Sequence, residues 1–143
     1  MSYLVKDYMD KDVPTVDGST SVTEAAQRIS KTGKGFLIVL EEGKPQGIVT
    51  EKDFVEKIVA KELDPAKILI KKIMSSPLIT VDPDENLLKA SEIMQKHDIR
   101  RIPVTKDNII YGVITASKIA QRCGEYVDQS LRDIMKWALP ISL

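Results

Sequence analysis

Two groups of polar side chains stand at positions where they could bind a small anionic ligand. Thr50 ends an apolar run and begins a predicted helix, so the backbone N–H groups after it lack partners within that helix and favour an anion. Asp53 adds a carboxylate, and hydrogen bonds to a charged group contribute about 1.5–3 kcal/mol each. Arg100 and Arg101 carry forked donors that match the oxygens of a phosphate.

Both groups also have a purely structural interpretation. A Thr followed by an acid three residues later is an ordinary helix start, because the helix dipole favours the acid there. Arg100 and Arg101 could lie on a solvated strand edge or pair with Asp98. Adjacent side chains of an extended segment point to opposite faces, so one Arg of the pair is expected to reach a given ligand.

The elements that position these residues belong to a sequence repeat that occurs twice in the chain. A shift of 65 positions places Val5–Ile58 on Ile70–Cys123 without a gap. Ten aligned pairs are identical, including Met9/Met74, Gly47/Gly112 and Thr50/Thr115. Such a repeat indicates two copies of one supersecondary unit packed face to face, with a groove between them where a ligand would bind.

Hydrophobic periodicity predicts the order strand, helix, strand, strand, helix within each copy. In the first copy, apolar residues at helical spacing begin at Val22, and Phe36–Leu40 is continuously apolar, as in a strand buried on both faces. Gly47–Thr50 is predicted as the next strand and leads into the second helix. The predicted fold class is therefore α/β (α+β), with the two repeats related by a pseudo-two-fold axis.

The predicted organisation has four parts, and the last is the least expected. They are repeat 1 (1–61), a linker (62–69), repeat 2 (70–124) and a C-terminal helical tail (125–143). Within the tail, Leu131–Met135 resembles Val5–Met9 and Ile70–Met74, like the opening of a third repeat. The tail could cover an exposed end of the module, or act as a dimerisation or partner-docking element.

Two segments carry a family resemblance. Gly47–Asp53 reads Gly-Ile-Val-Thr-Glu-Lys-Asp, and Ile99–Val104 reads Ile-Arg-Arg-Ile-Pro-Val. With the gapless repeat, they resemble the cystathionine-beta-synthase (CBS) domain family, and the tandem arrangement resembles a CBS pair, or Bateman module, over about residues 4–123. The resemblance implies a regulatory module that binds AMP, ADP, ATP or S-adenosylmethionine in clefts between the repeats.

The resemblance also implies roles for individual residues. The segment ending at Thr50 and Asp53 would hold the ribose, the extended stretch of the opposite repeat would grip the base, and Arg101 aligns with the position that meets phosphate. The predicted ligand-binding residues are Ile48, Thr50, Asp53, Pro77, Leu78, Ile79, Ile99, Arg100, Arg101 and Pro103.

The second cleft is predicted to be degenerate. Lys118 stands where repeat 1 has Asp53, and a lysine cannot accept hydrogen bonds from ribose hydroxyls. Repeat 1 also lacks the Arg pair, since Gly35 and Phe36 occupy those positions. The residues assigned to this cleft are Val13, Pro14, Lys34, Thr115 and Lys118, whose lysines could still hold an anion.

Composition disfavours several other functions. The 143 residues include 21 basic and 21 acidic side chains, and zero net charge disfavours a general nucleic-acid or membrane-surface binder. The first ten residues lack a signal-peptide pattern, and the longest apolar run is far too short to span a membrane. The single cysteine permits no internal disulfide, and no nucleophile–base pair or metal cluster is evident. A cytoplasmic protein without catalytic residues, bound metal or cofactor is expected.

The leading prediction is a sensor that binds an adenine nucleotide as regulatory ligand, forms a homodimer and acts on an unidentified effector protein. One alternative is a sensor of S-adenosylmethionine or methylthioadenosine, which share the adenosine group. Another is an interaction or dimerisation module whose cleft is only structural. The sequence does not decide among these three possibilities.

Overall fold

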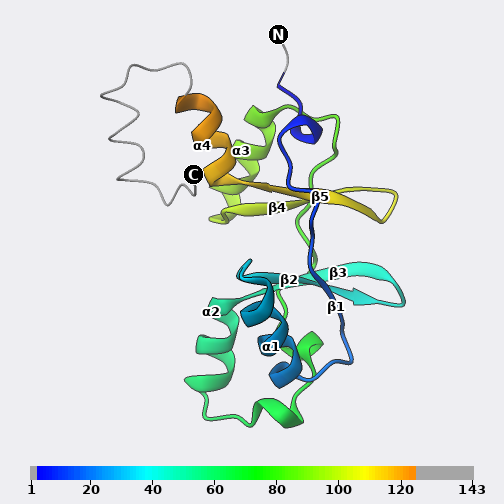
Figure 1. The fold of residues 1–143 in the computed structure, drawn as a ribbon, viewed down its shortest axis with the longest axis vertical. Coiled ribbons are helices and arrows are strands. Elements are labelled where there is room, and N and C mark those ends of the chain that lie inside the picture. Colours follow the sequence, from blue (N-terminus) through cyan, green and yellow to red (C-terminus); the bar gives the residue numbers. More distant parts are fainter. Residues whose placement is uncertain (1–2, 125–143) are drawn as a thin grey trace. The chain divides into compact units, whose positions relative to one another are not determined.

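A computed structural model describes residues 3–124 of the chain, with the side chains of residues 3–122 (Figure 1). These residues form two compact units of mixed α+β structure, one of residues 13–79 and one of residues 3–12 with 80–124. They are called the 13–79 unit and the 80–124 unit below. Within the described range, no helix combines the length and the apolar character needed to cross a membrane.

The 13–79 unit contains a three-stranded sheet and two helices on one side of it (Figure 1). Its strands are β1 (Thr15–Asp17), β2 (Phe36–Glu41) and β3 (Lys44–Thr50), with β1 parallel and β3 antiparallel to β2. Its helices are α1 (Val22–Thr32) and α2 (Glu51–Phe54), and a π-helical turn at Val55–Val59 continues α2. Ser21 caps α1 by accepting a hydrogen bond from the Glu24 N–H, and Gly33 ends it at a φ of 71°.

The 80–124 unit contains a two-stranded antiparallel ribbon with two helices. Its strands are β4 (Arg101–Lys106) and β5 (Ile109–Thr115), and its helices are α3 (Leu87–His97) and α4 (Ala116–Gly124). Asn86 caps α3 by accepting from the Lys89 N–H at 2.8 Å, and Asp98 ends it in the left-handed conformation.

Strand pairing repeats with the 65-residue spacing of the sequence. Val39 pairs with Gly47 as Val104 pairs with Gly112, and each hairpin has a register shift after its valine. The first strand predicted for repeat 2, the extended stretch Leu78–Val81, is reduced to one parallel bridge between Val81 and Val104. Proline explains part of this difference. In repeat 1 the Ile38 N–H donates to the Pro14 carbonyl at 3.0 Å. In repeat 2 the position of Ile38 is occupied by Pro103, which has no N–H to donate.

The compact units do not coincide with the sequence repeats, because each repeat lends its opening segment to the other unit. Val5–Met9, which contains the 3-10 turn η1 (Val5–Asp7), packs in the 80–124 unit beside β5 (Figure 1). Ile70–Met74, which contains η4 (Ile70–Lys72), packs in the 13–79 unit. Val5 and Ile70 are both 0% exposed, so each opening segment completes a core built by the other repeat.

The predicted linker, residues 62–69, is an ordered part of the 13–79 unit. Asp64 caps the 3-10 turn η3 (Pro65–Lys67) by accepting from the Ala66 N–H at 3.0 Å. The Ile68 carbonyl then accepts from the Val22 N–H at 2.8 Å, which ties the segment to the start of α1. The predicted C-terminal tail, residues 125–143, lies outside the described residues.

Candidate functional site

Thr50 and Asp53 form a reciprocal cap at the start of α2. The Thr50 N–H donates to Asp53 Oδ2 at 2.9 Å, and the Thr50 side chain accepts from the Asp53 N–H. Asp53 is only 8% exposed, which is unusual for a carboxylate at the beginning of a helix. The structural interpretation of the pair is therefore present in the fold, and a role in ligand binding stays a prediction.

Lys57 holds the other carboxylate oxygen of Asp53 and was not among the predicted residues. Its Nζ lies 2.9 Å from Asp53 Oδ1 and donates to the Ile73 carbonyl at 2.7 Å. The signal in the sequence was the spacing of four residues between acid and base on one helix. Each carboxylate oxygen has two lone pairs, so these contacts leave Asp53 with acceptor sites for a ligand hydroxyl.

A two-residue bridge brings the other predicted residues of this unit to the edge of β3. The Ile48 N–H donates to the Ser75 carbonyl at 3.1 Å, and the Ser75 N–H donates to the Ile48 carbonyl at 2.9 Å. The chain then continues through Pro77, which is exposed, to Leu78 and Ile79, which are half-buried. Six predicted ligand-binding residues thus belong to the 13–79 unit: Ile48, Thr50, Asp53, Pro77, Leu78 and Ile79.

The other four predicted residues belong to the 80–124 unit, where they lead into and form β4. Ile99 is half-buried, and its N–H donates to the Met94 carbonyl at 3.0 Å. Arg100 is exposed and Arg101 is half-buried, which agrees with the expected alternation of the two side chains. Pro103 is almost completely buried on β4, so its apolar ring serves the interior of the fold.

A hollow of about 530 Å³ lies at the start of α4, and we call it the α4 hollow. Its lining residues are Met9, Asp10, Lys11, Thr115, Ser117, Lys118 and Gln121. Thr115 Oγ1 accepts from the Lys118 N–H at 3.1 Å and shares a 3.1 Å hydrogen bond with Ser117 Oγ.

Two residues predicted for the second cleft, Thr115 and Lys118, therefore line one hollow. The other three, Val13, Pro14 and Lys34, belong to the 13–79 unit. Met9, Asp10 and Lys11 were not predicted there, because they precede the strand of repeat 1 and nothing in their local pattern indicates packing against repeat 2.

Comparison with known proteins identifies the two sequence repeats. Residues 5–60 and 70–125 each match the family model of the CBS domain. The chain belongs to the CBS domain family. The two matched segments lie in tandem, so the chain is a CBS pair.

Individual relatives agree with this assignment. The CBS pair is 34% identical over 113 residues to MK0525 of Methanopyrus kandleri, an alignment that covers 78% of this chain and 58% of that protein. It is 30% identical over 132 residues to the CBS domain-containing protein YhcV of Bacillus subtilis, covering 91% and 94% of the two chains. The CBS pair of protein MJ0100, solved in complex with 5′-methylthioadenosine and S-adenosyl-L-methionine, matches with a TM-score of 0.79 at 30% identity, covering 89% and 100%.

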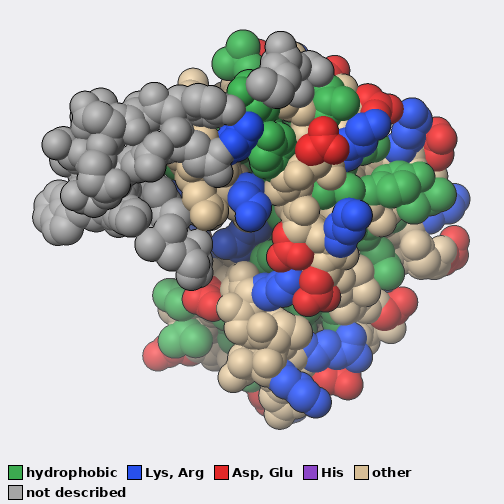
Figure 2. All heavy atoms as spheres, turned by 45° about the horizontal axis from the view of Figure 1, so that its top comes forward, with side chains coloured by type: hydrophobic (Ala, Val, Ile, Leu, Met, Phe, Trp, Pro, Cys, Tyr) green, Lys and Arg blue, Asp and Glu red, His purple; other side chains and the backbone are tan. Residues whose placement is uncertain are grey.

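The charged surface of the CBS pair is mixed in sign. On the face drawn in Figure 2, Lys and Arg side chains are interspersed with Asp and Glu side chains. Among the described residues, no group of three or more His, Cys, Asp or Glu side chains is arranged to hold a metal ion.

Proposed function

We propose that this CBS pair is a non-catalytic sensor of an adenosine-containing ligand, and that Asp53 accepts hydrogen bonds from its ribose hydroxyls. The arrangement of the carboxylate is the observation that carries the proposal. Asp53 is held by the Thr50 N–H at 2.9 Å and by Lys57 Nζ at 2.9 Å, so a ligand would meet a carboxylate whose orientation is already fixed. Preorganisation of this kind lowers the entropic cost of binding.

Adenine nucleotides are the leading ligand class. Arg100 and Arg101 are adjacent guanidinium groups, and a guanidinium matches the geometry of phosphate oxygens. S-adenosylmethionine and methylthioadenosine form the second candidate class, supported by the likeness to the CBS pair of MJ0100, which was solved with both. All of these ligands share the ribose that Asp53 would contact.

Calorimetric titration with AMP, ATP, S-adenosylmethionine and methylthioadenosine tests this proposal. Asp53→Ala should weaken binding of the preferred ligand by roughly 10–100-fold, because each 1.4 kcal/mol of lost interaction is a factor of ten. Glu51→Ala is the matched control, since Glu51 is an exposed acid in the same helical turn.

Asp53→Ala also removes a helix cap, so thermal unfolding of both variants should be measured alongside. Equal affinity of the wild type and a folded Asp53→Ala variant would contradict the assignment of the ribose contact. Absence of heat with all four ligands, on protein freed of any co-purified ligand, would favour the interaction-module alternative.

We also propose that the CBS pair forms a homodimer through the helices of the 13–79 unit. An apolar hollow of about 390 Å³ between α1 and α2 supports this proposal; its lining includes Val22, Phe54, Ile58, Val59 and Pro65. Val59 is 70% exposed and Val55 is 59% exposed beside it. Exposed apolar surface of this kind marks association sites.

Val59→Glu should convert the dimer to a monomer, because the new carboxylate would lose its hydration in the interface. Sedimentation velocity measures this change directly. Lys61→Gln, on a neighbouring exposed position, changes the net charge by the same one unit and is the control that should leave the sedimentation coefficient unchanged. A wild-type protein that sediments as a monomer at micromolar concentration would contradict the proposal.

A further inference from the structure

The two opening segments, Val5–Met9 and Ile70–Met74, dock by equivalent backbone contacts. The first residue donates its N–H to a carbonyl of the receiving unit, Val5 to Glu85 at 2.8 Å and Ile70 to Thr20 at 2.7 Å. The fifth residue of each segment then donates to the carbonyl of the first, at 3.0 and 3.2 Å, which closes the turn. Each aliphatic first side chain is completely buried.

Each docked segment ends against a strand glycine. A Cβ atom placed on Gly112 would lie 2.7 Å from the Asp10 carbonyl oxygen and 2.8 Å from Met9. A Cβ atom on Gly47 would lie equally close to Ser75 and Met74. Glycine is thus required where the methionine and the following backbone cross the strand. We call these two places the Gly112 groove and the Gly47 groove.

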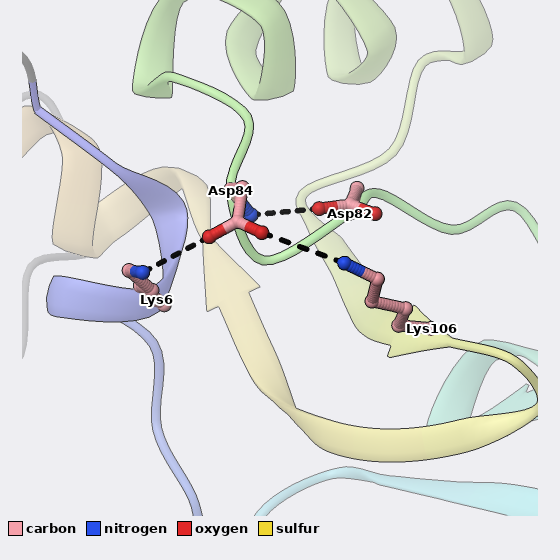
Figure 3. Close-up of polar contacts among 4 residues, drawn as sticks. All are labelled: Lys6, Asp82, Asp84 and Lys106. Carbon is pink, nitrogen blue, oxygen red and sulfur yellow. Dashed lines mark hydrogen bonds and ion pairs between the residues drawn. The ribbon is translucent and has the colours of Figure 1, made fainter.

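Two further contacts fix the segment in the Gly112 groove. Asp10 and Val113 exchange two backbone hydrogen bonds, each of 2.8 Å. Lys6 Nζ lies 2.9 Å from Asp84 Oδ1, and Lys106 Nζ lies 3.6 Å from Asp84 Oδ2 (Figure 3). The Asp82 side chain orients Asp84 by accepting from its N–H at 2.8 Å. The resident of the groove therefore has an aliphatic residue at its first position, a basic residue at its second and a methionine at its fifth.

A third segment of the chain satisfies the same requirements. Leu131-Arg132-Asp133-Ile134-Met135 has the aliphatic, basic and methionine residues at the required positions, although it lies outside the described residues. We propose that Leu131–Lys136 is a second occupant of the Gly112 groove in the same chain, and that it exchanges there with Val5–Asp10.

The third segment is more similar in sequence to the resident of the Gly112 groove, Val5–Asp10, than to the resident of the Gly47 groove, Ile70–Met74. Asp133 matches Asp7 in the resident segment, whereas Ile70–Met74 has Lys72 at that position. Pro140 follows Leu131 by the same nine positions that separate Pro14 from Val5. The third segment therefore shares with Val5–Asp10 the position of the proline that follows it.

The connection is long enough for docking within one chain. Helix α4 follows β5 directly, and its nine residues span about 13 Å at 1.5 Å per residue. Six further residues separate Gly124 from Leu131, and this connection can span at most about 25 Å when extended. Docking in the groove beside β5 therefore requires no second chain.

Exchange of the occupants would change the α4 hollow. Met9, Asp10 and Lys11 are part of its lining when the resident segment is docked. The equivalent positions of the third segment are Met135, Lys136 and Trp137, which replace an acid by a base and a lysine by an indole. The exchange would thus alter the charge of this hollow and give the chain two binding states.

Hydrogen exchange of the Val113 amide in the full chain tests the proposal, because this N–H donates to the resident segment. In the Met9→Asp variant, the protection factor of the Val113 amide should stay within about threefold of the wild-type value, since the third segment then binds in the groove. Met9→Asp combined with Met135→Asp should lower the protection at least about tenfold further, because neither occupant then binds. If Met9→Asp does not fold, the pair Met9→Ala and Met135→Ala serves the same comparison.

The Gly47 groove provides the internal control. Met74→Asp should lower the protection of the Ile48 amide equally with or without Met135→Asp, since the third segment is assigned to the other groove. The proposal is overturned if Met9→Asp alone removes as much Val113 protection as the double substitution. If the Val113 protection of the Met9→Asp variant increases with protein concentration, the third segment comes from a second copy of the chain, and docking within one chain is overturned.

Discussion

The charged contacts of single residues in this protein serve to hold segments in place. Asp84 pairs with Lys6 of the opening segment and with Lys106 of β4 (Figure 3). The hydrogen bond and charge of Lys6 lower the pKa of Asp84 below its ordinary value of 3.8, and the same contact raises the pKa of Lys6. Both side chains are about half exposed, 47% for Lys6 and 54% for Asp84, so solvent screens the pair and its contribution is small.

A pH dependence follows from the lowered pKa of Asp84. Its contribution to stability is complete well above the ordinary value of 3.8, where the carboxylate is ionised in both states, and is lost as pH falls through the lowered folded value. Asp84→Asn should therefore destabilise the protein at neutral pH and have a smaller effect at about pH 2. Urea unfolding at the two pH values measures this difference. Glu85→Gln is the control, and an equal effect of Asp84→Asn at both values would contradict the role of the charge.

At the same scale, the pattern of the sequence was most informative where chemistry is local. The cap of Thr50 and Asp53 follows from two residue types three positions apart, and the structure contains it. Lys57 shows the limit of that reasoning, because its bond to the Ile73 carbonyl joins residues 16 positions apart. The ligand roles of Asp53, Arg100 and Arg101 stay predictions.

At the scale of elements, the strand glycines control where the opening segments cross the sheet. Gly112→Ala should destabilise the protein by about 1–3 kcal/mol, because its Cβ would meet the Asp10 carbonyl at 2.7 Å and the backbone would have to shift. Gly18→Ala is the control, since its closest contact is a side-chain carbon at 3.2 Å. Chemical denaturation gives both free energies. A Gly112→Ala variant as stable as wild type would show that the strand and segment separate easily.

Periodicity predicted the elements well and their partners poorly. The uninterrupted apolar run of Phe36–Leu40 is buried as β2, and the spacing of Val22, Ala25 and Ile29 gives the buried face of α1. The destination of Val5–Met9 could not be predicted in this way. A five-residue segment carries no signal for which of two similar cores receives it, because both cores offer the same contacts.

At the scale of the whole molecule, the exchange of opening segments determines which fragments can fold. Residues 13–79 contain a complete core that includes Ile70 and Ile73, whereas residues 5–61 lack both of these buried side chains. A chain of this size is near the lower limit for a stable core, so the loss of two buried isoleucines is decisive. Fragment 13–79 should therefore unfold cooperatively on heating, and fragment 5–61 should show no transition.

Circular dichroism of the two fragments measures this difference, and fragment 13–79 with Ile70→Asp is the matched control. That variant keeps the full length but loses the completely buried first residue of its opening segment, so it should resemble fragment 5–61. A cooperative transition in fragment 5–61 would show that the opening segment is dispensable for the core.

The exchange of segments also constrains how such a gene can change over time. Loss of either half of the duplicated sequence would remove one repeat and, with it, the opening segment that completes the core of the other repeat. The surviving half would be left with an exposed apolar groove on one of its strands, beside Gly47 or Gly112. We therefore expect a chain reduced to either half to be unstable, which would make the duplication difficult to reverse.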